Sequence, residues 1–219
     1  MAQTRAQMVT YVTDKFGVTT SAMTTRAGGF YDARYRMIQD RYLWKQLLVS
    51  ETSTLAADQQ DVTLTSAIDV VIAIRWNKVH LHPVNQEQVF QLNAEAFDGS
   101  GDAMGFSVLP KTSAGLSRIR LYETPTQGKE LLVLGKAPPE TLTDSETPRM
   151  TGIDQSLHAY ILGDLWQSIR QFGKADVLFK EAEAFLDQMI KIEREQSAYN
   201  PQIIIADDGQ WDRDDVLYY

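Results

Sequence analysis

The sequence predicts an α+β fold: a helical bundle from the N- and C-terminal helices, an inserted small antiparallel β domain, and an extended C-terminal arm. Three observations predict it. Apolar residues recur at helical spacing near both ends of the chain, short β-type runs broken by turns fill the middle, and the last residues follow neither pattern. The predicted boundaries are residues 1–50, 51–149, 150–199 and 200–219.

The first helix is predicted from Val9, Val12 and Phe16, which recur at helical spacing. Thr4 is its expected N-cap. Gly17 is its expected stop, because glycine tolerates the left-handed conformation that ends many helices.

A second helix is predicted from about Ser21 to Leu48, where Tyr31, Tyr35, Ile38 and Tyr42 follow one another at steps of three or four. Two adjacent glycines, Gly28 and Gly29, weaken its beginning, so a start near Phe30 is the alternative.

The middle of the chain predicts seven short strands, as in a small antiparallel sandwich or barrel. The expected strands are Leu48–Leu55, Val62–Thr65, Val70–Trp76, Val79–His82, Gly105–Leu109, Arg118–Glu123 and Glu130–Gly135. Glycine, proline and polar turn residues separate them. A short helix is expected at Gln86–Ala96.

Two apolar stripes predict helices again after residue 150, with Asp154 as an expected N-cap. The first stripe is Leu157, Ile161, Leu165, Ile169 and Phe172, and the second is Leu178, Ala182, Phe185, Met189 and Ile192. The second stripe resembles the seam by which one helix packs on others.

The segment from Asn200 onward combines five aspartates with large apolar side chains. A disordered tail rarely carries so many apolar groups, so we expect an arm that docks on a partner. The predicted docking residues are Ile203, Ile204, Ile205, Trp211, Val216, Leu217, Tyr218 and Tyr219.

Composition excludes several classes of protein. The 219 residues include no cysteine, which excludes a disulfide scaffold, a thiolate zinc site and a cysteine nucleophile. No stretch approaches the ~20 apolar residues of a membrane span, and no signal peptide is visible, so we expect an intracellular protein without a membrane partner. The net charge of −8 argues against a general nucleic-acid coat.

The charge is unevenly distributed along the chain. Residues 1–50 carry a net charge of +4, residues 51–150 carry −5, and residues 151–219 carry −7. Such asymmetry favours charge-complementary contacts between copies, although a solvated surface explains it equally well. The candidate residues for contacts between subunits are Arg34, Arg41, Lys45, Asp187 and Glu193.

No catalytic or cofactor motif is present, so the sequence predicts neither an enzyme nor a cofactor. His80 and His82 share one face of an expected strand, but no third ligand is evident, and we expect no metal there. His158 is expected to be structural. The aspartates after Asp207 lack the ligand order and closing glutamate of a calcium loop.

A basic set is interleaved with aromatic residues in the second helix, a mixture that can bind nucleic acid. The basic residues are Arg34, Arg36, Arg41 and Lys45. On a helix, Arg34, Arg41 and Lys45 would share a face distinct from the aromatic stripe. We therefore favour an aromatic core stripe with a charged outer face.

The order of parts resembles that of tailed-bacteriophage head-to-tail adaptors, also called head completion or connector proteins. The segments that carry the resemblance are RAGGFYDARYRMIQDRYLWKQL, IDVVIAIRW, LLVLGKAPPETL and GIDQSLHAYILGDLWQSIRQFGKADVLFKEAEAFLDQMI. The segments Asp40–Trp44 and Leu178–Ala182 are the most typical. These are packing patterns that cover nearly the whole chain.

The resemblance implies a virion protein at the head-to-tail junction, assembled in the host cytoplasm. It implies a ring, usually of twelve copies, that docks under the portal protein, contacts tail proteins and lets DNA pass through its bore without specific binding. It also implies that residues 202–219 grip the portal. Two alternatives stay open: another phage tail component such as a tail terminator, and a nucleic-acid-binding DNA-packaging factor.

Overall fold

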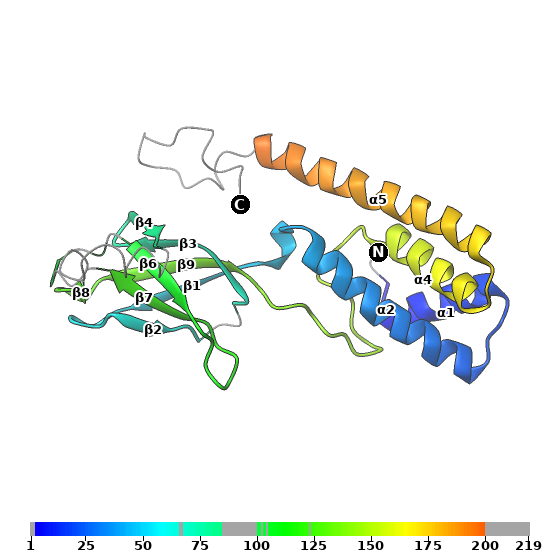
Figure 1. The fold of residues 1–219 in the computed structure, drawn as a ribbon, viewed down its shortest axis with the longest axis horizontal. Coiled ribbons are helices and arrows are strands. Elements are labelled where there is room, and N and C mark those ends of the chain that lie inside the picture. The colour runs from blue at the N-terminus through cyan, green and yellow to red at the C-terminus, as the bar shows by residue number, and fades with distance from the viewer. Residues whose placement is uncertain are drawn as a thin grey trace. The chain divides into compact units, whose positions relative to one another are not determined.

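The computed structural model describes residues 3–65, 68–84, 100–101, 103, 105–122 and 124–199, and its fold is mixed α+β (Figure 1). The chain divides into two compact units. Residues 1–34 and 151–219 belong to the first, which we call the helical unit, and residues 35–150 form the second, which we call the β unit. Among the described residues, no helix has both the length and the apolar content to cross a membrane.

Helix α1 (Arg5–Phe16) begins and ends as the sequence predicts. Thr4 and Gln7 form a capping box, in which each side chain accepts a hydrogen bond from the other residue's backbone N–H. Gly17 ends the helix with φ +82°, a conformation that favours glycine. The expected N-cap and stop are therefore confirmed.

Helix α2 (Ser21–Arg41) begins at Ser21, as the sequence predicts. It continues through Gly28 and Gly29, so the alternative start near Phe30 is wrong. A Cβ atom at position 28 would lie 2.9 Å from Nη2 of Arg5, so glycine there leaves room for the Arg5 guanidinium, which pairs with Asp32.

The expected continuation of this helix to Leu48 is also wrong, because α2 ends at Arg41. Trp44 takes an extended conformation, and its indole Nε1 donates a 2.8 Å hydrogen bond to the Ile38 carbonyl. The buried tryptophan thereby supplies a hydrogen-bond donor to one of the last carbonyls of the helix, which have no donor within the helix itself. A 3-10 turn (Lys45–Leu47) and the first strand follow.

Helices α4 (Asp154–Ser168) and α5 (Phe172–Tyr199) pack closely in the helical unit (Figure 1). Leu157, Ile161 and Leu165 are buried as predicted. Asp154 is the first helical residue, so it is not the N-cap that the sequence predicted; that position belongs to Ile153.

The contact between α4 and α5 depends on a glycine. A Cβ atom at Gly163 would lie 2.5 Å from the ring of Phe179, so the two helices need glycine at this position. Ile169 and Phe172 follow the end of α4, at the turn into α5, and are 44% and 62% exposed. The prediction that they extend the buried stripe is wrong.

The β unit contains nine described strands. They are β1 (Leu48–Thr54), β2 (Asp61–Thr63), β3 (Val70–Trp76), β4 (Val79–Pro83), β5 (Ser100–Gly101), β6 (Gly105–Leu109), β7 (Arg118–Tyr122), β8 (Thr124–Pro125) and β9 (Glu130–Lys136). Seven of them match the seven predicted strands to within two residues at each end. The expected helix at Gln86–Ala96 lies outside the described residues.

Seven strands form one sheet in the order β1-β9-β3-β4-β6-β7-β2, and β5 pairs with β8 separately. The prediction of a purely antiparallel sheet is wrong at two pairs, because β4 runs parallel to β6 and β5 runs parallel to β8. Parallel neighbours need a long connection, and residues 84–104 supply one between β4 and β6.

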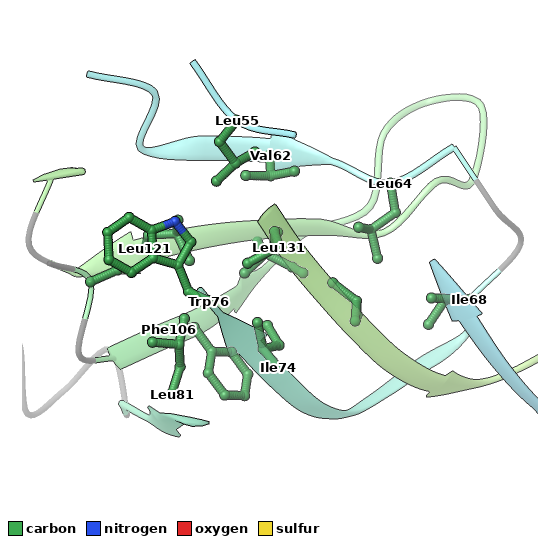
Figure 2. Packing of buried hydrophobic residues seen from close by; sticks show 13 residues of the cluster. Leu55, Val62, Leu64, Ile68, Ile74, Trp76, Leu81, Phe106, Leu121 and Leu131 are labelled. Atoms are coloured by element: carbon green, nitrogen blue, oxygen red, sulfur yellow. The ribbon is translucent and has the colours of Figure 1, made fainter. Parts of the chain in front are cut away.

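The inner face of this sheet encloses one apolar core (Figure 2). Trp76, Phe106 and Ile74 lie close together within it, and each is at most 5% exposed. A Cβ atom at Gly135 would lie 2.3 Å from the Ile68 side chain, so glycine lets the segment before β3 cross the inner face of β9. Burial of this cluster against water is the main force that holds the β unit.

Candidate functional site

Arg34 is engaged inside the helical unit. Its Nε and Nη2 atoms donate hydrogen bonds of 2.7 and 2.6 Å to the two carboxylate oxygens of Asp164. The guanidinium also lies 4.9 Å from the ring centroid of Tyr160 and 5.1 Å from that of Phe179. The hydrogen bond to Asp164 raises the pKa of Arg34, against the lowering effect of burial. This residue therefore joins α2, α4 and α5.

The other candidate interface residues are distributed over both units. Arg41 is exposed at the end of α2, and Lys45 is half-buried in the following 3-10 turn. Because the helix has ended before Lys45, the prediction that this lysine shares a helix face with Arg34 is wrong. Asp187 is exposed and Glu193 half-buried on α5.

The predicted docking residues of the arm lie outside the described residues. They are Ile203, Ile204, Ile205, Trp211, Val216, Leu217, Tyr218 and Tyr219. Their docking stays a prediction.

Two histidines lie side by side on the outer face of β4. His80 is half-buried and His82 is exposed, and the buried Leu81 between them points into the core. In the part of the chain that the structure describes, no three His, Cys, Asp or Glu side chains are grouped so that they could hold a metal ion.

His158 packs within the helical unit, as a structural histidine would. Its ring centroid lies 4.4 Å from that of Tyr11, and its Nε2 is 3.0 Å from Oε1 of Gln3. Burial lowers the pKa of His158, and the nearby Asp154 carboxylate opposes that effect.

A buried carboxylate in the β unit was not predicted. Glu51 is 7% exposed, and its Oε1 accepts hydrogen bonds of 2.7 and 2.8 Å from the backbone N–H and the hydroxyl of Thr65. It lies on the inner face of β1, between two other inward positions, Val49 and Ser53. The sequence does contain a signal for this buried carboxylate, because Glu51 is an acidic residue at an inward position of an alternating strand.

A group of charges lies at the opposite end of the same sheet. Asp61 on β2 accepts hydrogen bonds of 2.7 and 2.9 Å from Nε and Nη2 of Arg120, and Nη2 of Arg118 is 3.5 Å away. These contacts, chiefly the hydrogen bond from Arg120, lower the pKa of Asp61. The short strand β2 therefore carries one charged residue, Asp61, which pairs with two arginines of β7.

Several large apolar side chains are exposed around the turn between α4 and α5. Ile169, Phe172 and Val177 are 44%, 62% and 64% exposed. On the β unit, Val70 and Ile72 are exposed along β3. Single exposed apolar residues are ordinary, whereas a contiguous apolar patch is typical of surfaces that another protein covers.

Arg34 with Asp164, and Glu51 with Thr65, are thus internal contacts, whereas the exposed apolar side chains are accessible at the surface. Exposed apolar side chains of this kind can contribute to contacts between proteins. Comparison with protein-family models and with curated proteins gives no match for this chain.

Proposed function

We propose that this chain is a structural protein of the virion, a head-to-tail adaptor that forms a ring beneath the portal of a tailed bacteriophage. In this proposal the ring has about twelve copies, joins the capsid to tail proteins and surrounds the DNA channel. The protein is not an enzyme and needs no cofactor. The sequence resemblance to adaptors is the starting point.

The observation that carries the proposal is the exposed apolar group at the α4–α5 turn. Phe172 and Val177 leave more than half of their side chains in water, which is unfavourable unless another molecule covers them. A ring supplies such a molecule at every copy, because each subunit buries two different surfaces against its two neighbours.

The division of the chain also supports an adaptor. We infer a helical bundle with an inserted β domain, because both ends of the chain contribute to the helical unit and one continuous segment forms the β unit. The long α5 precedes the C-terminal arm directly. The arm, with Trp211 and the final two tyrosines, would then bind the portal, since aromatic side chains dominate binding energy.

The charges fit a ring that surrounds DNA without holding it. A dozen copies at −8 each would carry a total of roughly −100, which repels phosphates. For contacts between copies, the proposal places Arg41 and Lys45 of one copy opposite Asp187 and Glu193 of the next, while Arg34 stays within the helical unit with Asp164.

The test is electron-microscopic image averaging of the full chain mixed with a portal complex. We expect a closed ring of this chain on the portal. Deletion of residues 201–219 should leave the circular dichroism spectrum of the folded chain unchanged and weaken portal docking. Absence of a ring on the portal under every condition would refute the adaptor function, and salt-dependent DNA binding that requires Arg36 and Arg41 would favour the packaging factor.

A further inference from the structure

We propose that the free edge of β1 receives an added strand, Ile203–Ala206, from the C-terminal segment of a neighbouring copy. The inference rests on the proposed ring and names one contact by which a copy would hold the next. Strand addition of this kind takes its affinity from main-chain hydrogen bonds and its specificity from alternate side chains.

The register of the sheet identifies which backbone groups face this edge. The Ala137 N–H donates to the Leu47 carbonyl, and the Leu55 N–H donates to the Lys129 carbonyl. In an antiparallel ladder hydrogen-bonded pairs alternate, so the odd-numbered residues between Leu47 and Leu55 direct their backbone groups toward β9. The even-numbered residues therefore direct theirs away from β9.

Three of those even-numbered residues, Ser50, Thr52 and Thr54, are exposed. Their backbone groups have no hydrogen-bond partner in the described part of the chain. Leu48 differs, because its N–H donates to the Lys45 carbonyl. The edge thus offers the alternating donors and acceptors that a new strand requires.

The two ends of the sheet differ in their protection. Edge strands are usually kept from pairing by shortness or by charge, and β2 has both, with three residues and the Asp61–Arg120 pair. Strand β1 has seven residues, contains no proline or lysine, and has only Ser and Thr at its exposed edge positions. Thr65 is tied to β1 through the Glu51 side chain and not through a backbone ladder.

The chain itself carries a segment suited to this edge. Ile203, Ile204 and Ile205 are three consecutive β-branched residues, a type enriched in strands. Pro201 precedes them, and a proline at or before the first residue of a strand is well tolerated. Only three residues separate the end of α5 at Tyr199 from Ile203, so α5 of the donor copy must lie near the receiving edge.

We take the added strand as antiparallel to β1, because antiparallel pairs are slightly more stable per residue than parallel ones. In this direction Ile203 lies toward the Thr54 end of β1, and Asp207 and Asp208, which follow the isoleucines, lie toward the Leu48 end.

Single cysteines provide a direct test, because the natural chain has none. Full-length chains with Ser50→Cys or Thr52→Cys are each assembled into mixed rings with a second full-length variant. The second variant carries one cysteine, at a position from 203 to 206. Mild oxidation should give disulfide-linked dimers at alternate tail positions only, since neighbouring residues of a strand point to opposite faces. Antiparallel pairing requires that the tail position linked to position 50 lie two residues after the one linked to position 52.

Thr63→Cys, at the exposed end of β2, is the matched control and should give no dimer. Links of equal yield at all four tail positions, or a reversed offset, would each overturn the proposal. If the ring assembles but these links do not form, only the proposed strand addition is refuted. If the chain never assembles into a ring, with or without the portal, the proposed adaptor function is refuted as well.

Discussion

Replacement of Asp164 by leucine is expected to destabilise the helical unit. It removes the carboxylate that binds the Arg34 guanidinium and leaves that guanidinium beside the rings of Tyr160 and Phe179. The side chains of Arg34 and Asp164 are 25% and 10% exposed, and the hydrogen bonds are 2.6 and 2.7 Å long. Removing one partner of a fully buried pair costs about 3–5 kcal/mol. Because a quarter of Arg34 remains accessible to water, we expect a loss of about 2–3 kcal/mol for Asp164→Leu.

The second substitution, Arg34→Met, separates the charge effect from the packing effect. Alone, it leaves a nearly buried carboxylate unpaired and should cost about 3 kcal/mol. Combined with Asp164→Leu, it removes both charges and places a flexible thioether beside the rings of Tyr160 and Phe179, so the double variant should lie within about 1 kcal/mol of the natural chain.

Urea unfolding of the four chains measures this cycle, followed by far-ultraviolet circular dichroism, to which the helices contribute most of the signal. The expected coupling energy between the two sites is about 4 kcal/mol. Additive effects, with a coupling below about 0.5 kcal/mol, would refute the view that this pair is buried and mutually dependent. Ring assembly by a stable double variant would further show that Arg34 acts within the chain.

Two other predictions concern the helical unit. Gly163→Ala should destabilise it by about 1–3 kcal/mol, because the new methyl group meets the Phe179 ring, and a urea midpoint equal to that of the natural chain would contradict this packing. Lowering the pH below about 6.5 should weaken the natural chain more than a His158→Gln variant. The reason is that burial lowers the pKa of His158 in the folded state, so the unfolded chain binds the proton more readily. An equal pH dependence of the two unfolding free energies would contradict it.

The elements could be predicted where local periodicity decides the structure. The spacing of Val9, Val12 and Phe16 places α1 correctly, because a helix with one apolar face needs no distant partner to be recognised. The end of α2 could not be predicted. Trp44 continues the helical pattern in sequence, yet its indole bonds back to the Ile38 carbonyl, a tertiary contact that overrides the pattern.

The candidate site was predicted less completely than the fold. Arg34 was recognised as a charged helix residue, but its partner Asp164 is 130 residues away, and sequence spacing gives no information on such a pair. The free edge of β1 depends on which strands are neighbours, and the parallel pairing of β4 with β6 sets the sheet order in a way that alternating patterns do not reveal.

The division of the chain has a consequence for its synthesis. The β unit is one continuous stretch, so its core can close on the ribosome as soon as residue 150 has emerged. The helical unit cannot, because Val9 and Phe16 belong to a core that also needs α4 and α5, which are translated last. The apolar face of α1 therefore cannot be fully buried until late in translation. A chain interrupted before α5 would have a folded β unit and an incompletely folded helical unit.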